Sequence, residues 1–333
     1  QNLCEASRSV RREKSKIQWG NKAMATNVDV TYLPSEAIIS RDEESMLGLI
    51  WRHFRKHRIA LGGLFFVLFL VIACIIGPNV SPYDVEKSSL RERYQPPSLE
   101  HPFGTDDLGR DMLTRLLSGG RISLSIGLMS MSLAVAIGVT IGSVAGYYGG
   151  MVDNVLMRFT DIMLTMPRLF LLILMTLILR GIDWQYLQEG GGVFAIIVVI
   201  GILSWMGIAR LVRGSFLSLR EMEFVEAARS LGLSNRRIIT RHILPNAVSP
   251  VIVAATLGIA GAIIAESGLS YLGFGVQPPT PTWGNMLRNA QEEMLRGHMW
   301  MAIFPGVMIF VTVICINYIG DGLRDALDPK HVG

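Results

Sequence analysis

The sequence predicts an all-α integral membrane protein with six transmembrane helices. Half of the 333 residues are hydrophobic, only 17% are charged, and the mean hydropathy is +0.40, whereas a soluble domain typically carries about 25% charged residues. The charge is also unevenly placed, because long apolar runs alternate with short, strongly charged connectors. That pattern is typical of a chain folded in lipid, where each helix satisfies its own backbone hydrogen bonds.

Six segments are long and apolar enough to cross a hydrocarbon core about 30 Å thick, which takes about 20 residues of helix. They cover residues 59–77, 122–148, 155–179, 193–208, 247–272 and 300–319. We expect one helix for each segment. Pro167 lies inside the third and should kink it, because proline removes a backbone donor.

Basic residues flank these segments unevenly. They precede the first segment, separate the fourth from the fifth and follow the sixth. Because cytoplasmic flanks carry the excess of Lys and Arg, both termini and the fourth–fifth loop are predicted to be cytoplasmic. Residues 1–45 lack the apolar core of a signal peptide and are expected to form a disordered cytoplasmic tail, with a second cytoplasmic tail at residues 324–333.

The stretch before the second segment has an amphipathic pattern, with apolar residues from Leu108 to Leu117 on one helical face. Gly119-Gly120 should end this helix. We expect it to lie at the outer membrane surface, and an ordinary solvated helix is the alternative. The predicted organisation is therefore an N-terminal region, 46–120, followed by a core of five spans, 121–323.

Small residues recur at every fourth position of the second segment. They are Ser130, Ala134, Gly138, Gly142 and Gly146. Such a stripe lets helix backbones approach closely, and in lipid this packing replaces the hydrophobic drive. We predict a helix-packing face for Gly138, Gly142 and Gly146, with lining of a transport pathway as the alternative.

Four charged residues fall inside predicted spans: Arg158, Asp161 and Arg168 in the third, and Glu266 in the fifth. An isolated charge at the bilayer centre costs about 2.5–3.5 kcal/mol on insertion scales, so such groups usually face protein or a watery cavity. Arg158 and Asp161 are three residues apart and are expected to pair. Asp161, Arg168 and Glu266 are candidates either for inter-helix polar contacts or for the pathway.

The loop at residues 215–246 is predicted to fold as two short helices with a bend. Ser218 and Glu221 have the spacing of a capping box that would begin the first helix. Gly232 should follow its end. Ser234 is expected to cap a second, basic helix, and Pro245 to close the unit.

This loop resembles the EAA signature of ABC importer permeases. Glu226-Ala227-Ala228 is followed after three residues by Gly232, and after nine more by His242-Ile243-Leu244-Pro245. Further stretches resemble the C-type subunit of the oligopeptide/dipeptide permease branch. They are residues 101–111, 120–124, 210–214, 266–275, 283–284 and 320–329.

The resemblance implies a type I ABC importer transmembrane fold with the last five spans as its core. It also implies a homologous second permease subunit, two ATPase subunits and an extracytoplasmic solute-binding protein in a plasma (inner) membrane complex that imports peptides. The EAA loop would dock on an ATPase through residues that the signature includes, which are Glu226, Ala227, Ala228, Gly232, Arg237, His242 and Pro245. Arg168 departs from the small or apolar residue expected there.

Other functions are disfavoured by missing motifs. The chain has no GxxxxGK[ST] phosphate loop, no HExxH and no GxSxG, and its three cysteines, Cys4, Cys74 and Cys315, form no cluster. We therefore expect no catalytic residue, no metal site and no cofactor bound by this chain, with ATP used by partner subunits.

Four alternatives remain open. The same architecture could carry nickel complexes or another small solute. A channel or carrier not driven by ATP would need a relay of intramembrane charges, for which Glu266 is the candidate. The two short helices could read DNA, although helices fixed between spans reach a major groove poorly. The arginines of the loop could serve topology alone.

Overall fold

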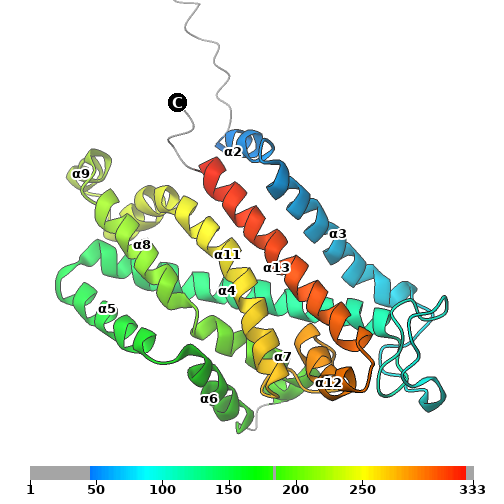
Figure 1. The fold of residues 1–333 in the computed structure, drawn as a ribbon. Coiled ribbons are helices and arrows are strands. Elements are labelled where there is room, and N and C mark those ends of the chain that lie inside the picture. Colours follow the sequence, from blue (N-terminus) through cyan, green and yellow to red (C-terminus); the bar gives the residue numbers. More distant parts are fainter. Residues whose placement is uncertain (1–45, 183–184, 328–333) are drawn as a thin grey trace, which may run out of the picture. The chain divides into compact units, whose positions relative to one another are not determined.

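The computed structural model describes residues 46–182 and 185–327, and the first predicted tail lies outside them (Figure 1). The regular structure of these residues is helical, apart from one isolated bridge between Thr105 and Asp111. The helices of the N-terminal half are α2 (Met46–Phe54), α3 (Arg58–Val80), η2 (Leu90–Glu92), α4 (Met112–Tyr148), α5 (Gly150–Thr165) and α6 (Arg168–Arg180). Those of the C-terminal half are α7 (Gln185–Ile202), α8 (Trp205–Leu219), α9 (Glu223–Ser230), α10 (Asn235–Arg237), η3 (Ile238–Ile243), α11 (Leu244–Tyr271), α12 (Trp283–Leu295) and α13 (Trp300–Leu327).

Five helical segments of the described residues are long and apolar enough to cross a membrane. They are α3, α4, Gly190–Leu219, Asn235–Tyr271 and α13. The pair formed by α5 and α6 passes the same test together and is bent by 95°. Counting this pair as one broken span gives six, which confirms the predicted all-α membrane fold.

Two of the spans are broken, which the sequence predicts only in part. The chain leaves the helix at Met166-Pro167, so the third span is two helices at a steep angle and not one kinked helix. The predicted fourth span lies within the candidate span Gly190–Leu219, but it contains an unpredicted interruption of two residues, because α7 ends at Ile202 and α8 begins at Trp205. At this second break the Ser204 hydroxyl donates to the Ile200 carbonyl (2.6 Å), and such back-bonding is a known cause of helix bending.

Helix α4 runs without interruption for 37 residues, so the predicted end at Gly119-Gly120 is wrong. Both glycines are buried inside the helix. A Cβ added at Gly120 would lie 2.6 Å from the Cys74 sulfur and 2.8 Å from the Trp283 ring, so glycine here permits close packing. The predicted division at 120/121 therefore falls within one helix about 55 Å long.

The stretch 101–111, one of those that resemble the oligopeptide/dipeptide permease branch, forms a hydrogen-bonded network at the start of α4. Asp111 caps the helix by accepting from the Thr114 N–H (2.8 Å), and its second oxygen lies 2.9 Å from His101 Nδ1. Asp106 accepts from Arg110 Nε (2.7 Å). The Trp300 indole N–H donates to the Thr105 carbonyl (3.2 Å), which ties the network to α13.

Helices α3, α13 and α11 lie side by side (Figure 1), with α11 also packed on α4. At the start of α3, a Cβ added to Gly322 would lie 2.4 Å from the Ala60 side chain, and His57 Nε2 lies 3.6 Å from an Asp325 carboxylate oxygen. Because α13 continues to Leu327, the predicted tail at 324–333 begins inside this helix. Residues 328–333 lie outside the described part.

Candidate functional site

The predicted cytoplasmic loop is built around α9, which ends at Ser230 and is followed by Gly232 at the predicted C′ position. Gly232 has a φ of +75°, which glycine adopts without strain. Its N–H donates to the Arg229 carbonyl (2.9 Å), and the Leu233 N–H donates to the Ala228 carbonyl (3.2 Å). These two bonds are the Schellman arrangement that satisfies the last carbonyls of a helix.

The two ends of the loop differ from the prediction. Helix α8 runs on to Leu219, and the residue before α9 is Met222, so the predicted capping box of Ser218 and Glu221 is wrong. Pro245 does not close the unit, because α10 continues through a π-helical turn directly into α11. Proline is accommodated there because it lies just after the π-helical turn, in which the regular i→i−4 bonding of the helix is already interrupted.

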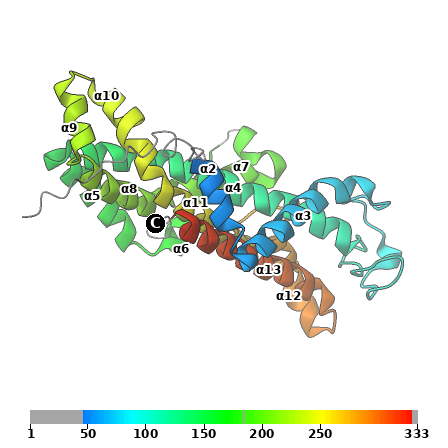
Figure 2. The same ribbon diagram turned by 90° about the horizontal axis from the view of Figure 1, so that it is seen from above.

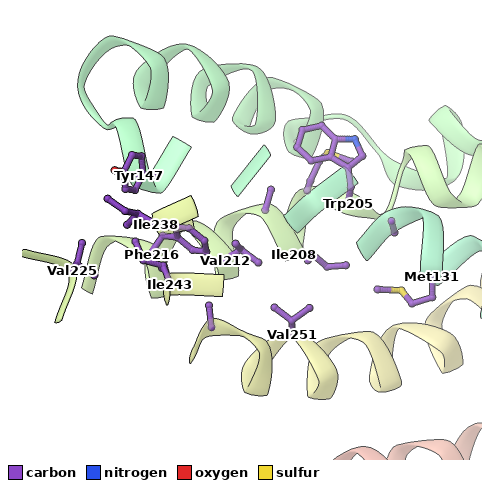
Figure 3. Close-up of a cluster of buried hydrophobic side chains, with 14 of the residues drawn as sticks. Met131, Tyr147, Trp205, Ile208, Val212, Phe216, Val225, Ile238, Ile243 and Val251 are labelled. Carbon is purple, nitrogen blue, oxygen red and sulfur yellow. The ribbon is translucent and has the colours of Figure 1, made fainter. Parts of the chain in front are cut away.

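The loop packs tightly on its own chain. Val225 and Ala228 of α9, and Ile238 and Ile243 of the π-helical turn, are buried in one apolar cluster with Phe216 of α8. Figure 3 shows Val225, Ile238 and Ile243 lying around Phe216. Figure 2 shows α9 and α10 side by side, joined by a short turn.

Polar contacts fix the same unit to the end of α4. The Tyr147 hydroxyl donates to Asn235 Oδ1 (2.8 Å), and the Arg229 guanidinium lies 5.6 Å from the Tyr147 ring centre. Arg220 donates to the Gly146 carbonyl (3.1 Å). The loop is therefore bonded to the end of α4, and the chain connects it directly to α8 and α11.

The outer face of α9 is left uncovered by the described residues, 46–182 and 185–327. Glu226 and Ala227 are exposed, and so are three large apolar side chains, Met222 (50%), Phe224 (40%) and Leu231 (80%). The predicted coupling residues therefore differ in their exposure. Glu226, Ala227, Gly232, Arg237 and Pro245 are exposed, His242 is half-buried, and Ala228 is buried against its own chain.

The three glycines of the α4 stripe face α8. Added Cβ atoms would lie 2.7 Å from Ile208 Cβ at Gly138, 2.8 Å from Val212 Cβ at Gly142 and 2.6 Å from Phe216 Cβ at Gly146. Each step of four residues along α4 matches a step of four along α8. The two backbones thus run in parallel at a separation that side chains would not permit.

A cavity of about 360 Å³ lies where the two broken spans meet α4 and α11. The break between α5 and α6 contributes Met166 and Arg168, and the break between α7 and α8 contributes Leu203 and Ser204. The remaining lining residues are mostly apolar or small: Met131, Met163, Leu164, Leu171, Met206, Gly207, Ile208, Ala254, Gly258 and Gly261. Irregular backbone at membrane depth is tolerated where it lines such a cavity.

The candidate polar residues of the spans lie in three different places. Arg168 lines the cavity, and its Nη2 donates to the Ser204 hydroxyl (3.0 Å). Asp161 does not line it; its carboxylate accepts from Arg210 of α8. The predicted pairing of Asp161 with Arg158 is therefore wrong.

Glu266 is buried away from the cavity, in contact with α4 and next to α12. It accepts hydrogen bonds from the hydroxyls of Ser123 (3.2 Å) and Ser270 (2.7 Å). The Ser123 hydroxyl in turn accepts from the Trp283 N–H at the start of α12 (3.3 Å). Of its two predicted roles, the geometry corresponds to the inter-helix polar contact.

Several residues at these sites were missed by the sequence prediction. Arg210 and Arg213 were read as topology residues, yet they pair with Asp161 and Asp153 of α5. Three residues of α8 rise about 4.5 Å and eight residues of α5 about 12 Å, so the spacing along the sequence did not indicate these two pairs. Nothing in the pattern pointed to the bond of Tyr147 with Asn235 or of Ser204 with Arg168, because each of these partners is distant in sequence.

Comparison with known proteins identifies the family. Residues 138–332 match the family described as the binding-protein-dependent transport system inner membrane component, and residues 45–97 match the N-terminal transmembrane domain of oligopeptide transport permease C. The chain belongs to this family of ABC importer permeases. The predicted resemblance to the C-type subunit of the oligopeptide/dipeptide branch is thereby confirmed.

Curated relatives align with most of this permease. The dipeptide transport system permease protein DppC of Bacillus subtilis (strain 168) is 42% identical over 84% of each chain. The oligopeptide transport system permease protein OppC of Haemophilus influenzae is 39% identical over 89% of this chain and 94% of its own. The glutathione transport system permease protein GsiD of Escherichia coli O157:H7 is 41% identical over 85% and 90%.

A solved structure supports the fold. A chain of the MetNI methionine ABC transporter in an inward-facing conformation has a TM-score of 0.52 at 20% identity, covering 65% of this permease and 98% of its own length. At that identity the likeness concerns the fold alone. The predicted type I ABC importer fold is confirmed.

Proposed function

We propose that this permease is one of two channel-forming subunits of an ATP-driven importer of peptides. The names of its relatives, DppC and OppC, support a peptide substrate. The name of GsiD, a glutathione permease, fits the same chemistry, since glutathione is itself a small peptide. Nickel complexes or another small solute would be the competing cargo.

The observation that carries this proposal is the exposed face of α9. The helix is fixed on its inner side by buried Val225 and Ala228, while Phe224 and Leu231 stay exposed on its outer side. Exposed apolar residues with a charged neighbour such as Glu226 are typical of a surface that binds another protein. A rigid unit of this kind can transmit displacement, whereas a loose loop cannot.

The proposed mechanism is alternating access. ATP binding closes the two ATPase subunits, which move α9 and the helices bonded to it. The cavity between this permease and a homologous second one then opens outward and accepts a peptide from an extracytoplasmic binding protein. ATP hydrolysis resets the inward-facing state. This chain binds no cofactor and has no enzymatic activity in this scheme; the ATP is bound and hydrolysed by the partners.

The same scheme sets the orientation in a plasma (inner) membrane. The loop around α9 and both chain termini face the cytoplasm, and the network of residues 101–111 faces outward. A shallow pocket of about 320 Å³ on the loop is lined by Arg236, Arg237 and Arg241. Guanidinium groups suit acidic partners, so this pocket supports docking beside α9.

The experiment reverses one charge on the docking face. The Glu226→Lys complex, reconstituted in liposomes with its ATPases and binding protein, should take up a radiolabelled dipeptide at least about tenfold more slowly, because like charges across an interface cost several kcal/mol. The matched control is Glu292→Lys, the same change at an exposed position of α12. It should transport at the native rate.

A second variant changes the shape of the unit and not its charge. Gly232→Pro fixes φ near −65°, where the loop needs +75°, and removes the N–H that caps α9. Uptake should fail although the permease still inserts and assembles. Uptake at the native rate by both variants would exclude docking through α9. A native complex that takes up a nickel complex but no dipeptide would exclude the peptide substrate.

A further inference from the structure

The cavity at the two helix breaks contains a single charged lining residue among the described residues, Arg168. It lies near the middle of α4 and α11, because Met131 and Gly258, which line it, stand near the centres of those helices. Transporter substrates commonly bind at this depth, between discontinuous helices. A charged side chain at this position, such as Arg168, can therefore contact a transported substrate as well as lipid.

Arg168 is held in place but is not neutralised within the described residues. Its Nη2 donates to the Ser204 hydroxyl, which is itself fixed by donating to the Ile200 carbonyl (2.6 Å). No carboxylate of the residues in 46–182 and 185–327 forms an ion pair with it, and nearby Asp161 is engaged by Arg210. A guanidinium has five N–H donors, so most of them remain for a ligand.

The backbone adds positive potential to the same cavity. Helix α6 begins at Arg168, and its start has no hydrogen bond from a capping side chain. The N–H groups at a helix start favour an anion. The Arg168 guanidinium and the start of α6 therefore both favour a negatively charged ligand.

The rest of the lining would accept varied side chains. Met131, Met163, Met166 and Met206 supply flexible, polarisable surface, and Gly207 and Gly261 leave open space where a Cβ would meet nothing within 4 Å. A volume of about 360 Å³ is within the range of small-ligand sites. One fixed charge beside adaptable walls suits cargo with a constant anionic group and variable side chains.

We propose that Arg168, oriented by Ser204, binds a carboxylate of the transported peptide inside the cavity. This inference rests on the proposed peptide transport. The carboxylate can be the C-terminal one, which every unmodified peptide carries, or an acidic side chain. Guanidinium–carboxylate pairs are strong and geometrically specific, so Arg168 discriminates charged cargo from its neutral analogue.

The test compares two peptides in the reconstituted complex, trialanine with a free carboxylate and trialanine amide. Each uptake rate is measured with native permease and with Arg168→Met. The same binding protein serves both permeases, so its own preference cancels when the acid-to-amide ratio of Arg168→Met is compared with the ratio of the native permease. We expect Arg168→Met to lower that ratio about tenfold, the equivalent of one charge-assisted hydrogen bond.

Further variants separate binding from structure. Arg168→Lys should retain part of the ratio, and Ser204→Ala, which removes only the anchor, should lower it less than Arg168→Met does. The matched control is Arg158→Met, an exposed arginine of α5 outside the cavity lining, which should leave the ratio unchanged. The amide of Ala-Asp-Ala shows whether a side-chain carboxylate serves as well; a response limited to the free terminus and one shared by both peptides each support a carboxylate site.

Several outcomes overturn the inference. Equal loss of acid and amide uptake in Arg168→Met and Arg168→Lys would make the residue a structural one, and an unchanged ratio would leave it without a part in recognition. A shift of the same size in Arg158→Met would reflect general electrostatics. The proposed peptide transport itself is refuted by a different result, the absence of ATP-dependent uptake of either peptide by the native complex.

Discussion

Glycines have opposite roles on two faces of helix α8: on one face they permit close packing, and on the other they leave open space. On one face, Gly138, Gly142 and Gly146 of α4 bring the two backbones together so closely that added Cβ atoms would overlap α8. On the other face, Gly207 of α8 and Gly261 of the facing helix α11 line a cavity, and an added Cβ at either would meet nothing within 4 Å. The first face makes a rigid contact; the second leaves room for movement or cargo.

The difference teaches that small residues in a membrane helix carry two meanings. A stripe at every fourth position indicates packing when a second helix follows it in register, as α8 does. Gly207, which lies beside the break between α7 and α8, instead marks open space, because an added Cβ would meet nothing within 4 Å. Spacing alone predicts the first case but cannot exclude the second, because the break lies in a different helix.

The sharpest way to test this contrast is to make one chemical change on both faces. In Gly142→Ala the new methyl group would press on the Ala209 carbonyl and on Val212, so we expect a loss of about 2–3 kcal/mol, in the range of overpacked cores. The melting temperature of the purified permease should fall by several degrees. Gly207→Ala should leave it unchanged or raise it, since alanine favours helix; equal shifts would contradict the contrast.

A smaller loss of stability is expected for the buried polar contact between α11 and α4. Glu266→Leu removes the acceptor for the Ser123 and Ser270 hydroxyls in a buried site. Leaving such donors unsatisfied costs about 1–3 kcal/mol. Glu266→Gln keeps a carbonyl oxygen in place and should lose less. Thermal unfolding of both variants gives the comparison, and a Gln variant less stable than the Leu variant would refute the inter-helix assignment.

The smallest effects should come from the ion pairs between α5 and α8. The Asp153 side chain is 11% exposed in its pair with Arg213, whereas the side chains of Asp161 and Arg210 are about half exposed. Exposed pairs contribute about 0.2–1 kcal/mol. Double-mutant cycles with alanine should therefore give a larger coupling energy for Asp153–Arg213 than for Asp161–Arg210. The reverse order would mean that burial does not control these contacts.

Much of the fold could be predicted from the sequence. Six spans, the glycine that ends α9 and the proline in the third span follow from hydropathy, glycine conformation and the missing proline N–H. The resemblance of Glu226-Ala227-Ala228 and of residues 101–111 to a known family supplied the fold type. These features are local, or are recorded in short motifs.

What could not be predicted depends on contacts between distant residues. Gly119-Gly120 has the pattern of a helix end, but its neighbours Cys74 and Trp283 make it a packing site. Asp161 has a possible partner three residues away, yet α8 presents Arg210 instead. Ser204 gives no signal of its contact with Arg168, which lies 36 residues away in the sequence.

The unbroken length of α4 has one more consequence. Two other spans contain joints that can absorb rotation locally, but α4 joins Asp111 of the outer network to Tyr147 of the loop without any joint. A stiff rod about 55 Å long turns small angles into large displacements, so a swing of about 10° at one end shifts the other by roughly 10 Å. In the proposed mechanism, a displacement of α9 by the ATPase would therefore be transmitted along α4 to the opposite side of the membrane.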